Sequence, residues 1–324
     1  MTLVRKENLQ MASVDVNQLN ARYGAPGRIV FHRGFAGYPN VVIANKFGAA
    51  EISLLGANVL SYRPTGHSNV LFRSEKRDYN RGESIHGGIP LCWPQFGNRF
   101  SKELPQHGFA RLMVFEVRGT EYTEEMTEVT LGIKDDAETR KLWPHSFDLS
   151  FKVSVSMKLN LSLSTKNTGA EPFDFSCGFH PYFLVRDVGG VTVRGLAGAS
   201  YVDARHPDVG PTMLAGDFSA AGTPNHVFSL PEPKAGGPLS AIKHEFAILD
   251  GGLGRATAMV SAGNARCVVW NPGQAVKPAD LAEDDWKRFI CVEPVSDWPG
   301  GRTLAPGATH KLTVAIQASL DGAQ

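Results

Sequence analysis

The sequence predicts an all-β fold, a large antiparallel β-sandwich with few short helices. Strand-like apolar runs recur along the 324 residues, and the clearest of them alternates apolar and polar residues from 149 to 163. Such alternation buries one face of a strand and leaves the other in water or against a polar layer. Thirty-four glycines and 20 prolines supply the frequent turns that short antiparallel strands need.

The elements are expected in a simple order. Residues 1–27 form an N-terminal extension whose one helix, over residues 13–23, begins at a Ser13 cap. Strands follow within 39–64, 114–134 and 147–169, and in the last run the apolar residues from Leu149 through Met157 to Leu163 are assigned to the core face.

The Pro/Gly-rich stretch 203–238 is expected to form long loops over one face of the sandwich. A linker between two domains is the alternative reading of this stretch. Because strands of the same style continue on both sides of it, we expect a single domain over residues 1–324.

Composition and charge narrow the function. Lys+Arg 33 against Asp+Glu 32 gives a formal net charge of +1, which excludes the basic footprint expected of a nucleic-acid-binding protein and fits a small neutral or locally anionic ligand. The amino-terminal segment MTLVRKENLQMASVDVNQL lacks the apolar stretch of a secretion signal, and no apolar run approaches the roughly 20 residues needed to cross a membrane. We therefore expect a cytoplasmic monomer that contacts neither nucleic acid nor membrane.

The cysteines are scattered. Cys92, Cys177, Cys267 and Cys291 lie in separate apolar stretches, without paired C-x-x-C spacing. Reduced cysteine behaves as a small hydrophobic residue, so we expect four buried free thiols rather than a zinc site or disulfides. No other metal-ligand spacing appears, and the sequence predicts no metal.

Three residues carry the clearest chemical signal, each expected at the end of a strand: His107 in LPQHGFAR, His180 in CGFHPYF and Glu293 in FICVEPV. Glutamate is normally ionised at pH 7 and can accept a proton, while histidine titrates near that pH and can donate one. Pro181 biases His180 to an extended backbone and ends its strand. Glu293 follows four apolar residues and needs a partner or a function, since burying a bare charge costs several kcal/mol. The three residues predict an acid–base enzyme.

Two neighbouring segments are candidates for ligand contact. In SIHGGIPLCWPQFG, Trp93 and Phe96 would form a wall for the apolar face of a sugar, and a tight turn entering a buried strand is the alternative. In LPQHGFAR, strand alternation would place His107 and Arg111 on the face opposite Gln106, and a bend at Gly108 that changes this arrangement is the alternative. The Arg111 guanidinium has the forked geometry that hydroxyl pairs or phosphate accept. For His107, a core histidine with satisfied hydrogen bonds is the alternative.

Taken together, these segments resemble the aldose 1-epimerase (galactose mutarotase-like) superfamily, and more closely its hexose-6-phosphate mutarotase branch, the glucose-6-phosphate 1-epimerase-like proteins. The matching blocks run in the family's order from about residue 40 to 318, and they are HGGIPLCWPQFG, LPQHGFAR, LWPHSFDLSFKV, NTGAEPFDFSCGFHPYF, GLAGASYVDA, VVWNP, WKRFICVEP and LAPGATH. Each block is weak by itself, and the ordered set is specific.

The resemblance implies a mutarotase-like supersandwich with a sugar cleft on one face and with no metal or organic cofactor. It implies that Glu293 takes the proton from the anomeric hydroxyl while His180 protonates the ring oxygen, so that the ring opens and recloses to the other anomer. His107 would assist by a hydrogen bond near the reacting centre. Gln106 and Arg111 would hold the substrate, with Arg111 a candidate ligand of a phosphate.

Two positions depart from the branch. His86 stands in His-Gly-Gly-Ile-Pro where the branch usually has Arg-Gly-Gly-Ile-Pro, so an always-charged ligand becomes a titratable one. Asn225 and His226 stand where a loop usually carries Asp-Arg, so a carboxylate that binds sugar hydroxyls becomes an amide. Both changes concern the substrate, and in particular its 6-phosphate, while His180 and Glu293 are retained.

The sequence therefore predicts an isomerase that interconverts the α and β anomers of an aldose or an aldose 6-phosphate, with a small sugar or sugar phosphate as its partner. A non-catalytic carbohydrate-binding or regulatory protein on the same fold is the alternative, and it has no need for His180 and Glu293. A glycoside hydrolase or lyase would usually require a second essential carboxylate, and no partner for Glu293 is evident in the sequence.

Overall fold

The computed structural model describes residues 14–34, 37–76, 85–98, 103–232, 239–276, 278–298 and 300–320. Strands in these ranges form nine-, eight-, four- and two-stranded sheets, and all their pairings are antiparallel. The predicted all-β class is confirmed. Residues 1–13 of the predicted extension, with the Ser13 cap, lie outside the described residues. None of the helices in the ranges given above is long and apolar enough to cross a membrane.

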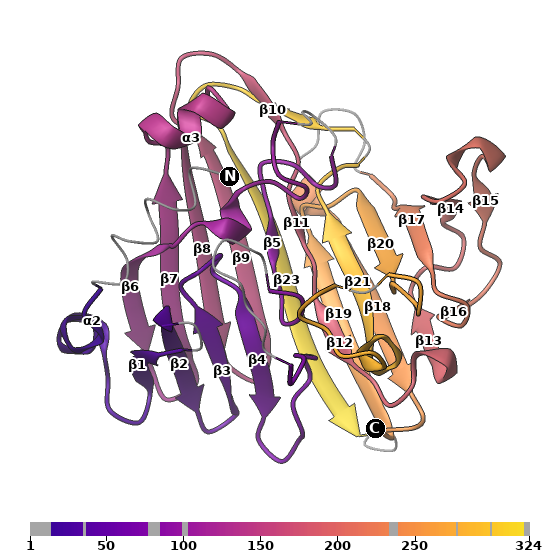
Figure 1. The fold of residues 1–324 in the computed structure, drawn as a ribbon, viewed down its shortest axis with the longest axis horizontal. Coiled ribbons are helices and arrows are strands. Elements are labelled where there is room, and N and C mark those ends of the chain that lie inside the picture. The colour runs from indigo at the N-terminus through magenta and orange to yellow at the C-terminus, as the bar shows by residue number, and fades with distance from the viewer. Residues whose placement is uncertain are drawn as a thin grey trace.

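The nine-stranded sheet extends across the whole molecule and forms its back layer in Figure 1. Its strands, in spatial order, are β16 (Phe218–Ser219), β13 (Val191–Arg194), β18 (Lys243–Asp250), β19 (Arg255–Ala262), β23 (Thr309–Leu320), β9 (Leu159–Asn167), β8 (Phe147–Val155), β7 (Thr127–Lys134) and β6 (Glu116–Tyr122).

The hairpin of β8 and β9 accounts for the long alternating run in the sequence. Phe151 pairs with Leu163 in this hairpin, and both side chains are buried, as predicted. Met157 is an exception, because it lies in the three-residue turn between the strands and is 65% exposed. The prediction that Met157 faces the core is therefore wrong. Because the turn has three residues, the apolar–polar alternation in the sequence continues unbroken through Met157, although this residue belongs to neither strand.

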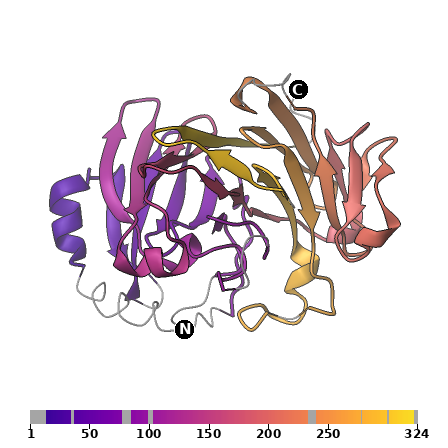
Figure 2. The ribbon, with the colours of Figure 1, turned by 90° about the horizontal axis from the view of Figure 1, so that it is seen from above.

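Two smaller sheets cover the nine-stranded sheet side by side (Figures 1 and 2). The four-stranded sheet consists of β1 (Ile29–Arg33), β2 (Pro39–Asn45), β3 (Gly48–Ser53) and β4 (Val59–Pro64). The eight-stranded sheet has the order β15 (Thr212–Met213), β14 (Ser200–Asp203), β17 (Asn225–Ser229), β20 (Arg266–Trp270), β21 (Phe289–Val295), β11 (Gly178–Phe179) and β5 (Leu91–Cys92), and β12 (Tyr182–Leu184) also pairs with β21. A separate ribbon pairs β10 (Phe173–Phe175) with β22 (Arg302–Leu304).

One large hydrophobic core lies between the layers. It takes side chains from all three large sheets, among them Ile52 of β3, Phe151 of β8 and Val292 of β21. Phe151 and Phe179 touch across the layers, with ring centroids 5.8 Å apart. We call this cluster the main core. One face of the eight-stranded sheet packs against it, and the opposite face carries the site described below.

The two α-helices within the described residues are short and depend on side-chain caps. In α2 (Val16–Tyr23) the Asp15 carboxylate accepts a hydrogen bond from the Asn17 backbone N–H at 2.8 Å, so Asp15 begins this helix and not the predicted Ser13. In α3 (Ala137–Leu142), which was not predicted individually, Asp136 and Thr139 form a reciprocal capping box. Six residues are too few to show a helical period in the sequence. The described part of the chain also contains five 3-10 turns: η2 (Ala110–Leu112), η3 (Val188–Gly190), η4 (Pro207–Val209), η5 (Leu239–Ala241) and η6 (Asp285–Arg288).

The stretch predicted as long loops, residues 203–238, contains β15, β16 and β17 instead. The first two are two-residue strands at the ends of the two largest sheets, too short to give an alternating pattern. Residues 233–238 lie outside the described residues.

Candidate active site

Strand β21 sends alternate side chains to opposite faces of the eight-stranded sheet. Ile290 and Val292 point into the main core, whereas Phe289 and Cys291 belong to a separate small cluster on the other face. Glu293, two residues beyond Cys291, shares that second face and is only 1% exposed. We call this second face of the eight-stranded sheet, which carries Cys291 and Glu293, the site face. Glu293 therefore lies inside a strand, and not at a strand end as predicted.

The neighbouring strands extend the site face. Trp270 of β20 pairs directly with Cys291, and Asn225 of β17 pairs directly with Trp270, so the three side chains lie on one face. His226 points the opposite way, and its ring packs against Phe218 and Tyr201 at centroid distances of 5.3 and 4.9 Å. Of the two residues at the position of the family's Asp-Arg pair, only Asn225 faces the site.

His180 enters the site face from the end of β11, as predicted. Its backbone N–H donates to the Pro90 carbonyl at 3.0 Å, which fixes the chain where it leaves the strand. Its ring stacks on Tyr182, with centroids 4.9 Å apart and an interplanar angle of 19°. The edge of Trp270 packs against the same ring at 5.5 Å. The imidazole therefore packs against two aromatic rings.

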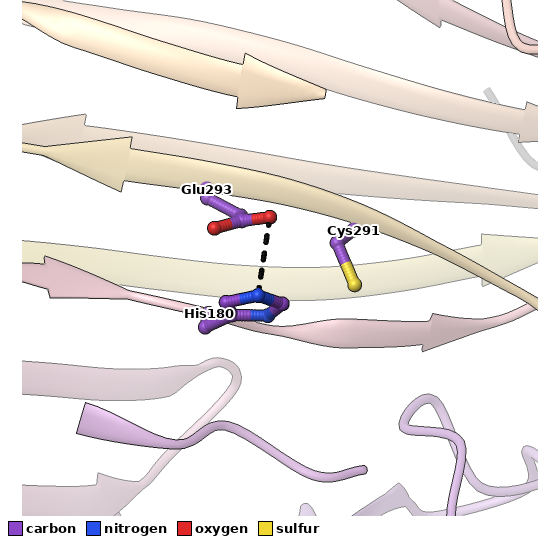
Figure 3. A group of neighbouring side chains, drawn as sticks. All are labelled: His180, Cys291 and Glu293. Carbon is purple, nitrogen blue, oxygen red and sulfur yellow. Dashed lines mark ion pairs between the residues drawn. The ribbon is translucent and has the colours of Figure 1, made fainter. Parts of the chain in front are cut away.

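His180 and Glu293 form a close pair (Figure 3). The Nε2 atom of His180 lies 3.5 Å from Oε1 of Glu293, and the two side chains are 10% and 1% exposed. Within the described part of the chain, His180 Nδ1 and Glu293 Oε2 are buried without a hydrogen-bond partner. Buried polar atoms are nearly always paired, so two orphaned atoms on adjacent acid–base groups indicate a place reserved for a ligand.

Burial shifts the pKa values of the pair in opposite directions. It raises the pKa of Glu293 well above 4.5, because an apolar strand surface disfavours the carboxylate. It lowers the pKa of His180 well below 6.5, with further lowering by electrostatic interaction with His107, Arg111 and His86. These shifts favour the neutral carboxyl and the neutral imidazole, a state in which the pair holds one proton, on Glu293. The expected ionised glutamate and protonated histidine contain the same number of protons and differ from this state by one proton transfer.

His107 lies in a turn, and the predicted strand through LPQHGFAR is wrong. Its φ is 60° and that of Gly108 is 75°, left-handed conformations that an extended strand excludes. Glycine is required at 108 because a Cβ atom there would lie 2.0 Å from the Trp93 carbonyl oxygen. The turn places the His107 ring edge-on to His180, with centroids 5.5 Å apart.

The protonation of His107 follows from its contacts. The Gly97 backbone N–H donates to Nδ1 at 3.2 Å, so Nδ1 carries no proton and Nε2 is the donor of the neutral ring. Burial, followed by the charges of Arg111 and His86, lowers the pKa of His107 to about 3. At neutral pH His107 is thus an uncharged hydrogen-bond donor beside His180.

Arg111 is held by the residue predicted to share its task. Its Nη2 donates to the Gln106 carbonyl at 2.8 Å, and its Nε is buried with no partner among the described residues. The 3-10 turn η2 carries Arg111, so the predicted strand alternation does not apply. Gln106 is exposed, and the contact found for it is this backbone carbonyl.

His86 is paired with Asp280, a residue that was not predicted. Its Nδ1 lies 2.7 Å from Asp280 Oδ1, and its backbone N–H donates to Oδ2 at 2.8 Å. Asp280 is 6% exposed, and the His86 ring packs edge-on against Tyr182 at 6.5 Å. Asp280 belongs to the acidic segment ADLAEDD, where nothing in the spacing distinguishes it from the other acidic residues, Glu283, Asp284 and Asp285.

Trp93 is a core residue and not the predicted wall for a sugar. It is 0% exposed, its indole N–H donates to Thr165 Oγ1 at 3.1 Å, and its ring packs against Phe109 and Phe147. Leu91 and Trp93 both belong to the main core whereas Cys92 lies on the other face, so the alternation of β5 continues into Trp93 and directs its ring into the core. The half-buried indole of Trp270 lies beside His180 instead.

Phe96 is likewise buried, at 4% exposure. Its ring packs against His107, with centroids 4.9 Å apart. The ring supports the catalytic turn and offers no free face.

Comparison with known proteins places this site in a family. The model of the aldose 1-epimerase family matches residues 39–317. A candidate glucose-6-phosphate 1-epimerase of Cenchrus ciliaris is 30% identical over 281 residues, which cover 83% of this chain and 81% of that protein. A protein of Salmonella typhimurium with the same description is 29% identical over 257 residues, 79% of this chain and 82% of its own length.

Solved structures agree with the sequence comparison. The crystal structure of a candidate mutarotase from Salmonella typhimurium matches with a TM-score of 0.81 at 26% identity, over 94% of this chain and 99% of that one. A galactose 1-epimerase from Lactobacillus acidophilus shares the fold with a TM-score of 0.68 at 14% identity, over 90% and 98% of the two chains. These findings support an epimerase and do not favour the non-catalytic alternative. The chain belongs to the aldose 1-epimerase family.

Proposed function

We propose that the protein interconverts the α and β anomers of an aldose or aldose 6-phosphate by ring opening and reclosure, with His180 and Glu293 as the acid–base pair. The observation that carries this proposal is the 3.5 Å contact between His180 Nε2 and Glu293 Oε1, in a buried pair whose other polar atoms have no partner within the described residues. Anomer exchange moves two protons and requires no other chemistry, and two adjacent groups that share one proton match this requirement.

When the sugar is bound in its ring form, Glu293 is ionised as the carboxylate and His180 is protonated as the imidazolium. Glu293 takes the proton of the anomeric hydroxyl while His180 gives its proton to the ring oxygen, and the bond between that oxygen and the anomeric carbon breaks. The pair is then left as the neutral acid and the neutral imidazole. Rotation of the aldehyde and reversal of both transfers close the ring on the other face.

The buried surroundings favour ring opening. Because desolvation raises the pKa of Glu293 and lowers that of His180, the neutral pair formed on opening is the state that the site stabilises. The Arg111 guanidinium acts in the same direction, since it lowers the pKa of His180 and makes its imidazolium a stronger acid. The site thereby stabilises the state that follows proton transfer relative to the state that precedes it.

His107 and Trp270 complete the surroundings of the reacting centre. His107 presents a neutral Nε2–H donor beside His180, suited to a sugar oxygen near the anomeric carbon. The partly exposed indole of Trp270 also packs against the His180 ring. It supplies an apolar surface of the kind on which sugar rings stack. Asn225 shares the site face with Trp270 and can accept from or donate to a hydroxyl.

A substrate phosphate would be bound by Arg111 and not by His86. The relatives from Cenchrus ciliaris and Salmonella typhimurium are described as acting on glucose 6-phosphate. In this chain, however, the Asp280 carboxylate lies 2.7 Å from His86 and balances any positive charge on its ring. Arg111, with a buried Nε free of partners in the described structure, remains available.

Two-dimensional NMR measurement of the rate of anomer exchange tests the proposal. α- and β-Glucose, galactose and their 6-phosphates each give separate anomeric signals, and exchange between them is measured with and without the protein. Catalysed exchange above the spontaneous rate with at least one of these sugars supports the function. Spontaneous rates throughout, in a folded protein that binds these sugars, would favour the binding protein.

A further inference from the structure

Cys291 adds a third donor atom to the acid–base pair. It lies two residues before Glu293 on the same face of β21, and the donor atoms of His180, Cys291 and Glu293 are all within 4.8 Å of one another (Figure 3). All three residues are buried, at 8%, 0% and 1% exposure. Both His180 and Glu293 retain a polar atom without a partner in the described part of the chain.

We propose that His180, Cys291 and Glu293 bind a single Zn²⁺ ion, and that the ion competes with the sugar and inhibits the enzyme. The proposal of a binding site depends only on the positions of these three side chains. The inhibition rests on the function proposed above, because two of the three ligands are its acid and base.

The donor set matches the preferences of zinc. A histidine nitrogen, a cysteine sulfur and a carboxylate oxygen are its usual protein ligands, and three protein ligands with an open fourth position are typical of catalytic zinc sites. Bond lengths of about 2.0 to 2.3 Å in a tetrahedron separate the donor atoms by about 3.3 to 3.8 Å. His180 Nε2 and Glu293 Oε1, 3.5 Å apart, already have this separation. The remaining donor pairs reach it with rotamer shifts of the order of 1 Å, because all lie within 4.8 Å.

Charge also favours a divalent ion over a monovalent one. A thiolate and a carboxylate together neutralise Zn²⁺, and a neutral complex is the arrangement with the smallest desolvation cost in a buried site. Arg111 interacts electrostatically with His180, and Asp280 with the neighbouring Tyr182; the two charges have opposite signs, so neither sign of ligand is excluded. The thiolate further selects Zn²⁺ against Mg²⁺, which prefers oxygen ligands in octahedral geometry.

The chain offers a matched control. Cys267 lies on the adjacent strand β20 and is also 0% exposed, but it belongs to the main core on the opposite face of the sheet. Cys267→Ser therefore removes a buried thiol from the same sheet, close to the Glu293 backbone, without removing any of the three proposed ligand atoms. Cys291→Ser and Cys291→Ala remove the proposed ligand, and two variants are used so that misfolding of one leaves the other.

Zn²⁺ binding is measured by calorimetry on the full chain against a competing chelator. We expect one ion per chain in the wild type and in Cys267→Ser, no binding of Mg²⁺, and a loss of affinity in the folded Cys291 variants of at least the roughly 10- to 100-fold that changes around metal ligands cost. Unchanged affinity in those variants, or the absence of stoichiometric Zn²⁺ binding, would overturn the proposal.

Co²⁺ provides a readout on the wild-type protein alone. A cobalt–thiolate bond gives a near-ultraviolet charge-transfer band, which we expect for the wild type and for Cys267→Ser. Bound Co²⁺ without this band would show that Cys291 is not a ligand, whatever the fate of the variants.

Activity separates this inference from the proposed function. Stoichiometric, Cys291-dependent Zn²⁺ binding in a protein that exchanges no sugar would leave the site standing and remove the function. If anomer exchange were unaffected by Zn²⁺ at concentrations that saturate the protein in calorimetry, the proposed function would be supported and the proposed inhibition would be refuted. We expect exchange to fall on Zn²⁺ addition and to recover fully when the ion is chelated.

Discussion

His180 and Glu293 approach each other to 3.5 Å on a sheet face that otherwise buries apolar side chains. Strand β21 places the carboxylate between Cys291 and Val295, and the chain leaving β11 places the imidazole opposite it. Two small hydrophobic clusters, one on either side of Glu293 along the sheet, account for the raised pKa of its carboxyl. The fold thus makes both charged forms costly and keeps one mobile proton between the two residues.

The first prediction concerns the pH dependence of exchange. Activity requires the singly protonated pair, and it is lost when a second proton binds His180 or when the last proton leaves Glu293. Because the pKa of His180 is lowered well below 6.5 and that of Glu293 is raised well above 4.5, we expect a broad plateau, with the acid limb well below pH 6.5. The rate of exchange, corrected for spontaneous mutarotation, is measured from pH 4 to 9. An acid limb centred at the ordinary histidine value would contradict this account.

The second prediction concerns stability. A carboxyl whose folded pKa is raised contributes stability that is present below the unfolded value of 4.5 and is lost as the pH rises through the folded value. Glu293→Gln cannot ionise, so the wild type should lose stability relative to this variant as the pH rises above 4.5. Urea unfolding of both proteins from pH 4.5 to 8 measures the difference. Glu124→Gln, at an exposed turn residue, is the control, and a pH-independent difference for Glu293→Gln would refute the prediction.

The third prediction separates two tryptophans. Trp93→Ala should lower the free energy of unfolding by about 3 to 5 kcal/mol, as expected for a large aromatic residue in a packed core, and should leave KM of the folded enzyme little changed. Trp270→Ala should raise KM more than it lowers stability, because its half-buried ring lies beside His180. Chemical denaturation and sugar kinetics on both variants check this, and the reverse pattern would restore Trp93 as the sugar wall.

The fourth prediction concerns the phosphate. Asp280→Asn removes the carboxylate that balances His86, so binding of a sugar 6-phosphate should strengthen relative to the unphosphorylated sugar, by a factor corresponding to about 1 kcal/mol. Arg111→Gln should shift the ratio the other way. The ratio of the two KM values is the measurement, since effects common to both sugars cancel in it. A ratio that neither substitution alters would show that these residues do not bind phosphate.

The sequence predicted the fold class well because the strand signal is local. Alternating burial in residues 147–167 depends on side-chain period alone, and β8 and β9 have that period. His180 and Glu293 were found for a related reason, since a histidine before proline and a carboxylate in an apolar strand are unusual within a short window. The single domain over residues 1–324 remains a prediction.

The misassigned residues depend on contacts distant in the chain. Trp93 was assigned to the site because an aromatic residue in a Gly/Pro-rich turn suits a sugar, but its partner Thr165 lies far along the chain, and pairing with it buries the ring. Asp280 is paired with His86 across a longer separation, 194 residues. Cys291 was expected to be a buried thiol, and it is, yet its neighbour His180 comes from another strand. Sequence spacing does not report such pairings, since they arise from sheet topology.

The most direct test of the central claim is NMR anomer exchange with Glu293→Gln and His180→Ala, each shown to be folded. Two exposed residues, Glu124 and His206, provide the controls Glu124→Gln and His206→Ala, which match the substituted residue types away from the site. We expect each site variant to exchange the best wild-type substrate roughly 100-fold or more slowly, the usual contribution of a positioned acid or base, while both controls keep the wild-type rate. Near-normal exchange by either folded site variant would contradict the assignment of His180 and Glu293 as the acid–base pair.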